Sequence, residues 1–307
     1  MRGVVLVCAC LLASASARAQ QASTGIPADR MRPGLGPTTL GSVEGGDTTP
    51  SGRLSTLLAL GYLRDPIVLR TSADGALVSR PVRAQLVGTF GFEVGLPRGF
   101  ALRASLPIAI NNDGDRLRGT GLGGSGNDAG PALESAAGDL QLGVKVGVIG
   151  APSQPGLHAA LALEGTIPLG GQKQFAATDG PTIAPRLMID YRLPWISIVL
   201  DAQARFVKQR PFFNASFGDE LVLAGGAISR IISFCAGRWH LSGYAEVQGI
   251  ITGDAAARPV ELRAALRLAR GSGVELDVGG GAGVVDAVGA PRYRIFAILR
   301  APLFGGR

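Results

Sequence analysis

Apolar and polar side chains alternate along many short stretches of this sequence. From Val82 to Gly95, Leu86 and Phe90 fall on one face of the chain, and Gln85 and Glu93 fall on the other. A period of two is that of a β-strand, whose successive side chains point to opposite faces of a sheet. Such stretches are about ten residues long, the length that a tilted strand needs to cross a bilayer. The alternation therefore predicts membrane-crossing strands with one apolar face.

About twelve such stretches follow one another, an even number as in bacterial barrels. They begin near Leu54, Val82, Ala101, Leu140, Leu157, Thr182, Ile196, Asp219, Trp239, Pro259, Gly273 and Arg292. Their connections alternate in length, so that short ones such as Leu96–Phe100 and Pro194–Trp195 lie between long ones such as Asn111–Asp139. Short turns at one end and longer loops at the other are typical of outer-membrane barrels. The sequence thus predicts an all-β fold, a transmembrane antiparallel up-and-down β-barrel of about twelve strands over residues 54–304.

The composition argues against several other classes of protein. Of the 307 residues, 46 are glycine, 46% are hydrophobic and 17% are charged. So much apolar surface argues against a disordered chain, and so much glycine argues against long helices. After the amino-terminal region, no stretch of about 18 residues is free of charges and turn residues, as a membrane helix would need. A barrel is the other structure that satisfies its backbone hydrogen bonds in lipid. A soluble secreted β-domain is the alternative, because its strands would also alternate.

The amino-terminal region has the features of an exported protein. Arg2 precedes the apolar run Val4–Leu12, and Ala17–Ala19 is a small-x-small cleavage site, so residues 1–19 are predicted to be a signal peptide. Residues 20–53 are rich in Gly, Pro and Thr and show no period, which predicts a flexible periplasmic segment ahead of the barrel. Together these features predict export to the outer membrane of a Gram-negative bacterium.

Charged side chains of both signs fall on the polar face of the predicted strands and are expected to line the lumen. The candidates are Arg83, Glu93, Arg103, Lys145, Glu164, Arg186, Asp190, Asp201, Arg205, Glu246, Glu261, Arg263, Arg267, Glu275 and Asp277. Opposite charges of this kind can pair across the interior and plug it, which would make a structural barrel. Alternatively, the small residues between them leave a water-filled path for small polar solutes. Both functions are non-enzymatic and need no cofactor or metal.

An enzymatic alternative rests on three residues of one predicted strand. His240, Ser242 and Glu246 lie on the same strand face, and some outer-membrane lipid hydrolases use a His/Ser/acid set. However, Leu241 and Gly243 occupy the lipid face, so His240 and Ser242 are expected to point into the lumen, away from membrane substrates. The sequence therefore favours the non-enzymatic functions.

The expected partners follow from the barrel hypothesis. Outer-membrane lipid and lipopolysaccharide would surround the wall. The barrel-assembly machinery recognises an aromatic residue at the carboxyl end of outer-membrane chains, and Phe304 is the nearest aromatic residue to that end here. No run of Lys and Arg points to nucleic acid.

Two stretches carry a resemblance to a known family. These are Gly138–Lys145 and Gly289–Phe296, and the region from Ser51 to Pro302 resembles the N-terminal barrel of outer-membrane-protein-A-like proteins of Gram-negative bacteria. The resemblance implies an outer-membrane barrel. In that family a peptidoglycan-binding domain follows the barrel, and we expect none here because the sequence stops at Arg307.

Overall fold

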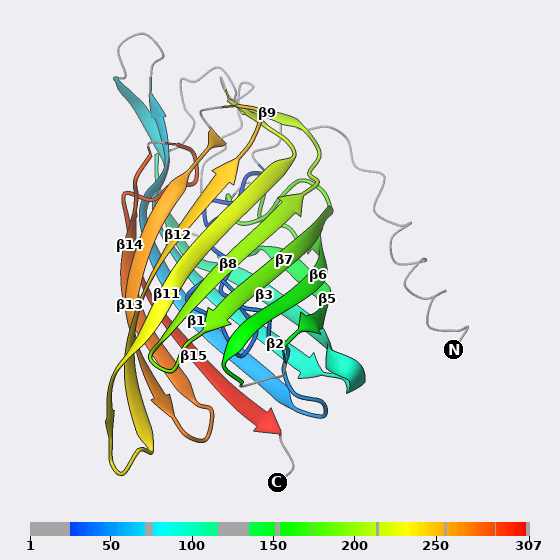
Figure 1. Cartoon of the computed structure of the whole chain (residues 1–307). Coiled ribbons are helices and arrows are strands. Elements are labelled where there is room, and N and C mark those ends of the chain that lie inside the picture. The colour runs from blue at the N-terminus through cyan, green and yellow to red at the C-terminus, as the bar shows by residue number, and fades with distance from the viewer. Residues whose placement is uncertain are drawn as a thin grey trace, which may run out of the picture.

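Twelve antiparallel strands of the computed structural model pair in chain order and form a closed barrel (Figure 1). The structure describes residues 25–70, 76–115, 135–150, 154–172, 174–212, 215–254, 257–285 and 287–304. The wall strands are β1 (Leu54–Arg70), β2 (Leu77–Gly95), β3 (Phe100–Asp113), β5 (Asp139–Ile149), β6 (Gly156–Pro168), β7 (Thr182–Arg192), β8 (Ile196–Arg205), β11 (Glu220–Phe234), β12 (Trp239–Ile251), β13 (Val260–Arg270), β14 (Glu275–Gly283) and β15 (Tyr293–Phe304). The barrel closes where β15 pairs with β1, from Tyr293 opposite Arg64 to Phe304 opposite Leu54.

Four short elements complete the described structure. A 3₁₀ turn, η1 (Pro97–Gly99), joins β2 to β3, and β4 (Ala136–Ala137) pairs with β3. The strands β9 (Arg210–Phe212) and β10 (Ala215–Phe217) form a hairpin in the long connection between β8 and β11. Among the described residues, no helix has the length and apolarity needed to cross a membrane.

The predicted twelve-strand antiparallel barrel is confirmed. Most strands begin within a residue or two of the predicted position, but β2 begins at Leu77 rather than Val82. The reason is Pro81, which interrupts the alternation in a part of the β1–β2 ladder where the register shifts between Arg64 and Arg70. Ser79 and Arg80 beside it are two consecutive polar residues, so the apolar–polar alternation does not extend over this part of the strand.

The outer face of the wall is apolar. Large side chains on it are strongly exposed, as at Leu60 (47%) and Leu163 (58%). Aromatic side chains lie towards both ends of the barrel, with Trp195 and Tyr191 near the short turns and Phe206 near the long loops. Such an apolar band between aromatic residues is the surface that a membrane barrel presents to lipid.

Two residues that fit a membrane strand poorly have local explanations. Pro185 lacks a backbone N–H, and it pairs with Leu163 of β6 at a point where the continuous β7–β8 ladder has not yet begun. Ser229 has a polar side chain beside the apolar face, and its hydroxyl donates to the carbonyl oxygen of Trp195 at 3.2 Å. Neither residue therefore breaks the wall.

Residues 25–50 lie inside the barrel, where Figure 1 shows them as a dark-blue trace. The side chains of Met31, Leu35, Leu40 and Val43 are buried in one apolar cluster with inward-facing wall residues. The predicted flexible periplasmic segment over residues 20–53 is therefore wrong for this stretch. It lacks a period because it is an irregular chain that fits the shape of the lumen. The predicted signal peptide, residues 1–19, lies outside the described residues.

The lipid-facing assignment can be tested at Leu142, a 44% exposed residue in the middle of β5. We expect Leu142→Arg to lower the free energy of unfolding by about 2–4 kcal/mol, because a cation on the lipid face near the bilayer centre loses its hydration. Leu169→Arg is the control, since Leu169 is 50% exposed but lies just beyond the end of β6. Urea unfolding in lipid vesicles measures both variants, and equal losses would contradict the assignment.

Candidate functional site

The luminal segment, residues 25–50, crosses the barrel from the long-loop end to the short-turn end. At the long-loop end, Ile26 and Ala28 pack in an apolar cluster with Phe175, and the Ala28 N–H donates to the Phe175 carbonyl at 2.8 Å. At the short-turn end, the backbone N–H and the hydroxyl of Thr49 donate to one carboxylate oxygen of Glu93, at 2.9 and 2.8 Å. The segment therefore occupies the whole length of the lumen.

Glu44 of the luminal segment forms ion pairs with three side chains of the wall. Its carboxylate is fully buried and forms ion pairs with Arg103 of β3, Lys145 of β5 and Arg186 of β7. The Lys145 ammonium lies 3.8 Å from it and also donates to the carbonyl of Gly45 at 2.8 Å. A single carboxylate of the segment thus holds cations of three separate wall strands.

Wall carboxylates accept hydrogen bonds from the backbone of the luminal segment. Glu246 accepts from the N–H groups of Ser42 and Val43 at 3.1 and 3.3 Å. Asp190 accepts from the N–H of Gly46 at 2.5 Å. These carboxylates satisfy donors that an irregular chain cannot pair with itself.

Gly46 is required at its position by close approach to the wall. A Cβ atom there would lie 2.5 Å from the backbone nitrogen of Ala159 in β6. The glycine content of residues 25–50 thus has a packing role at this point, which the lack of a period in the sequence concealed.

Wall arginines donate to backbone carbonyls of the segment and to wall carboxylates at the same time. Arg267 donates to the Thr39 carbonyl at 2.5 Å, and Arg300 donates to the Leu40 carbonyl at 2.9 Å. Both arginines also bind Asp277, each with one contact of 2.7 Å. The luminal charges are therefore neutralised within the wall as well as by the segment.

Most of the predicted lumen-lining residues are buried within the barrel. Buried ones are Glu93, Arg103, Lys145, Glu164, Asp190, Asp201, Glu246, Glu261, Arg263, Arg267 and Asp277. The side chains of Arg186, Arg205 and Glu275 retain exposures of 11%, 11% and 23%. Arg83 differs, because its side chain is 41% exposed and pairs with Asp113 towards the long-loop end.

Sequence reasoning missed several charged residues of the lumen. Among the wall residues these are Arg192, which pairs with Asp190 and Asp47, and Arg300, which pairs with Asp277. The alternation could have found Arg300, because it lies six residues after Arg294 on the same face of β15. Asp47 and the rest of the luminal segment carry no such signal.

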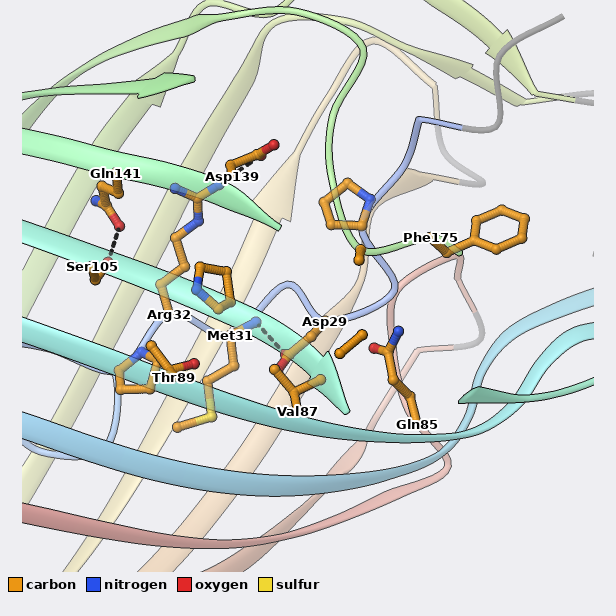
Figure 2. Close-up of a pocket in the computed structure, with 15 residues that line it drawn as sticks. Asp29, Met31, Arg32, Gln85, Val87, Thr89, Ser105, Asp139, Gln141 and Phe175 are labelled. Carbon is orange, nitrogen blue, oxygen red and sulfur yellow. Dashed lines mark hydrogen bonds and ion pairs between the residues drawn. The ribbon is translucent and has the colours of Figure 1, made fainter. Parts of the chain in front are cut away.

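The cavities described between the luminal segment and the wall are small. Figure 2 shows the pocket between the luminal segment and strands β2, β3 and β5, with Asp29 and Met31 facing Gln85 and Val87. Its cavity is about 40 Å³, and a second beside Arg186 is about 20 Å³. A buried water needs about 10–15 Å³ measured in this way, so each of these two cavities has room for only a few waters.

The residues of the enzymatic alternative have other partners. The Nδ1 atom of His240 lies 2.8 Å from the hydroxyl of Ser233, and Glu246 pairs with Arg263 at 2.7 Å. Glu246 also accepts the backbone N–H of Ser42 from the luminal segment. Within the described residues, the structure therefore does not join His240, Ser242 and Glu246 into a hydrogen-bonded set. No group of three His, Cys, Asp or Glu side chains in the described ranges is arranged to hold a metal ion.

Comparison with known proteins shows the fold alone. No protein-family model matches this chain, and no curated protein matches it. An outer membrane channel from Pseudomonas putida F1 is similar in structure, with a TM-score of 0.54 and 11% identity over 84% of this chain and 97% of that chain.

Two further solved structures superpose less well. The beta domain of the Bordetella autotransporter BrkA has a TM-score of 0.40 and 16% identity, covering 82% of this chain and 99% of that one. LpxR from Salmonella typhimurium has a TM-score of 0.42 and 10% identity, covering 80% and 99%. The outer-membrane-protein-A-like family that the sequence motifs resemble is not shown by any of these comparisons. The fold of this chain is that of outer-membrane β-barrels.

Proposed function

We propose that this chain is a non-enzymatic outer-membrane channel for small polar solutes, closed by its own luminal segment. The observation that carries the proposal is that the wall is complete without the segment. Each of the twelve wall strands pairs with two neighbours, whereas the one β-bridge of residues 25–50, Thr39 with Glu44, is internal to the segment. The segment can therefore leave without breaking the hydrogen-bonded ladder.

The charged side chains on the inner face of the wall support the proposal that the solute is polar. Acidic and basic side chains alternate around the lumen, as at Glu164, Arg186 and Asp201, and such groups favour water over apolar molecules. A twelve-strand barrel has a bore between that of filled eight-strand barrels and that of open sixteen-strand porins. The similar fold of the Pseudomonas putida outer membrane channel agrees with this function.

A purely structural barrel is the second candidate function, and a specific observation favours it. The segment buries Met31, Leu35, Leu40 and Val43, and full burial of one such side chain contributes about 1.5–3 kcal/mol. A segment held in this way can stay in place permanently. A measurement of conductance in planar bilayers distinguishes the channel from the structural barrel.

Glu44→Gln tests whether the segment gates the lumen. The variant removes the charge that holds Arg103, Lys145 and Arg186, so we expect more frequent opening and a current at least about threefold that of the wild type in planar bilayers.

Glu164→Gln is the matched control, because Glu164 also pairs with Arg103 and Arg186 but belongs to the wall strand β6. The channel proposal requires a larger current from the Glu44 variant than from the Glu164 variant. If neither folded variant carries more current than the wild type, the structural function is favoured.

A further inference from the structure

Exposed arginines gather at the short-turn end of the barrel. We call them the arginine arc: Arg53, Arg98, Arg230, Arg238 and Arg270. They lie in or beside the start of β1, the β2–β3 turn, the β11–β12 hairpin and the β13–β14 turn, which follow one another around the rim. The Gly271 N–H donates to the Arg238 carbonyl at 2.9 Å, so two of these turns are in direct contact.

Within the part of the chain that the structure describes, no acidic side chain neutralises the arc. None of its arginines takes part in an ion pair within the described residues. Carboxylates near the same end are engaged elsewhere, since Glu93 is fully buried and Glu275 pairs with Arg267. The exposed charges described at this end are therefore all positive.

The opposite end of the barrel has a different charge pattern. There Arg83 pairs with Asp113 at 2.5 Å, and Asp65 lies 3.7 Å from both Arg64 and Arg80. At the long-loop end, described acids and bases thus form ion pairs with one another, whereas the exposed charges described at the short-turn end include no acid.

Aromatic side chains surround the arc. The guanidinium of Arg270 stacks over the ring of Trp239 at 5.7 Å, and Trp195 in the neighbouring β7–β8 turn is 64% exposed. The β11–β12 hairpin extends past the neighbouring turns in Figure 1 and exposes Ile232 (53%) and Phe234 (40%). Tryptophan and arginine next to exposed apolar residues are typical of the boundary between acyl chains and headgroups.

We propose that the arginine arc binds the headgroups of anionic phospholipids in the leaflet that faces the short turns, with Arg238 and Arg270 as the main contacts. Guanidinium groups bind phosphate through paired charge-assisted hydrogen bonds, and anionic leaflets attract basic side chains at their surface. This inference rests on the barrel spanning a bilayer and not on its conducting solutes. The barrel can therefore be a closed structural protein and still bind lipid in this way.

The two tryptophans of the chain supply a direct probe, because Trp195 and Trp239 both lie at the short-turn end. The full protein is placed in phosphatidylcholine vesicles that contain either brominated phosphatidylglycerol or brominated phosphatidylcholine, whose bromine atoms quench nearby tryptophan. We expect the anionic lipid to bind at least about threefold more strongly than the neutral lipid, and high salt to weaken this preference.

Paired variants assign the preference to the arc. In Arg238→Gln/Arg270→Gln the preference should fall to about onefold, whereas Arg292→Gln should keep it, because Arg292 is exposed at the long-loop end. The ratio of the two lipids cancels any change in the brightness of Trp239. Heat-modifiable migration on a detergent gel shows that each variant is folded.

Three results of the quenching experiment would overturn the proposal. They are equal quenching by the two lipids in the wild type, a preference that survives in the double variant, and a preference lost equally in Arg292→Gln. Competition by inorganic phosphate at constant ionic strength, with no preference between the lipids, would assign the arc to free phosphate instead. Binding of an acidic protein without lipid preference would also reject it.

Discussion

Deletion of residues 25–50 is expected to raise the single-channel conductance by about tenfold or more, because a twelve-strand wall without its plug encloses a water-filled bore. The wall should survive the deletion, since its strands pair with one another throughout. Most luminal charges also keep a partner in the wall. Arg103 retains Glu164, and Arg263 retains Glu246.

Lys145 is the residue most affected by this deletion, because the carboxylate and the carbonyl that it contacts both belong to the segment. Planar-bilayer recordings measure the conductance, and heat-modifiable migration on a gel confirms that the shortened barrel is folded. A synthetic peptide of residues 25–50 should reduce the new current. A folded barrel that stays silent after the deletion would reject the channel function and leave the structural one.

Asp277→Ala is expected to lower the free energy of unfolding by about 3–5 kcal/mol, the typical effect of removing one partner of a buried ion pair. Asp277 is fully buried and accepts hydrogen bonds from Arg267 and Arg300, each with a contact of 2.7 Å, and from the hydroxyl of Tyr244 at 3.2 Å. The alanine variant leaves two arginines facing each other without their shared carboxylate.

Asp113→Ala provides the comparison for this effect. Asp113 pairs with Arg83 alone among the described ion pairs, and both side chains are 41% exposed, so water replaces the lost partner and the change should be below about 1 kcal/mol. Urea unfolding in vesicles measures both variants. Similar losses at Asp113 and Asp277 would show that the luminal charges are as well hydrated as the surface pair.

The wall of the barrel could be predicted from the sequence because each strand carries its own signal. The strands β7, β8 and β12 begin at Thr182, Ile196 and Trp239, as the alternation predicts. Alternation also selects the inward-facing side chains, which is why Glu93 and Lys145 are among the predicted lumen residues that prove to be buried. The position of such residues depends only on local strand geometry.

The occupation of the lumen could not be predicted in the same way. Buried apolar residues of the luminal segment, such as Met31, Leu35 and Leu40, follow no helical or strand period. Their burial is set by contacts with distant wall strands, and Ser42 binds Glu246 from 204 residues away. A Gly- and Pro-rich stretch without a period is therefore equally compatible with a free linker and with a buried plug.

The route of the luminal segment changes the topology of the chain. An even number of wall strands returns the chain to its starting side, and Leu54 and Phe304 indeed lie opposite each other at one rim. The segment adds one more crossing, so Gly25 lies at the other rim. A Cβ atom built on Gly25 would lie in contact with the Oδ1 atom of Asp179, which belongs to a long loop. The described chain therefore makes an odd number of crossings. When β1 pairs with β15, the wall closes around residues 25–50 of the same chain. In a barrel oriented with its long loops outward, a tag at Gly25 would face the cell exterior and a tag at Phe304 the periplasm.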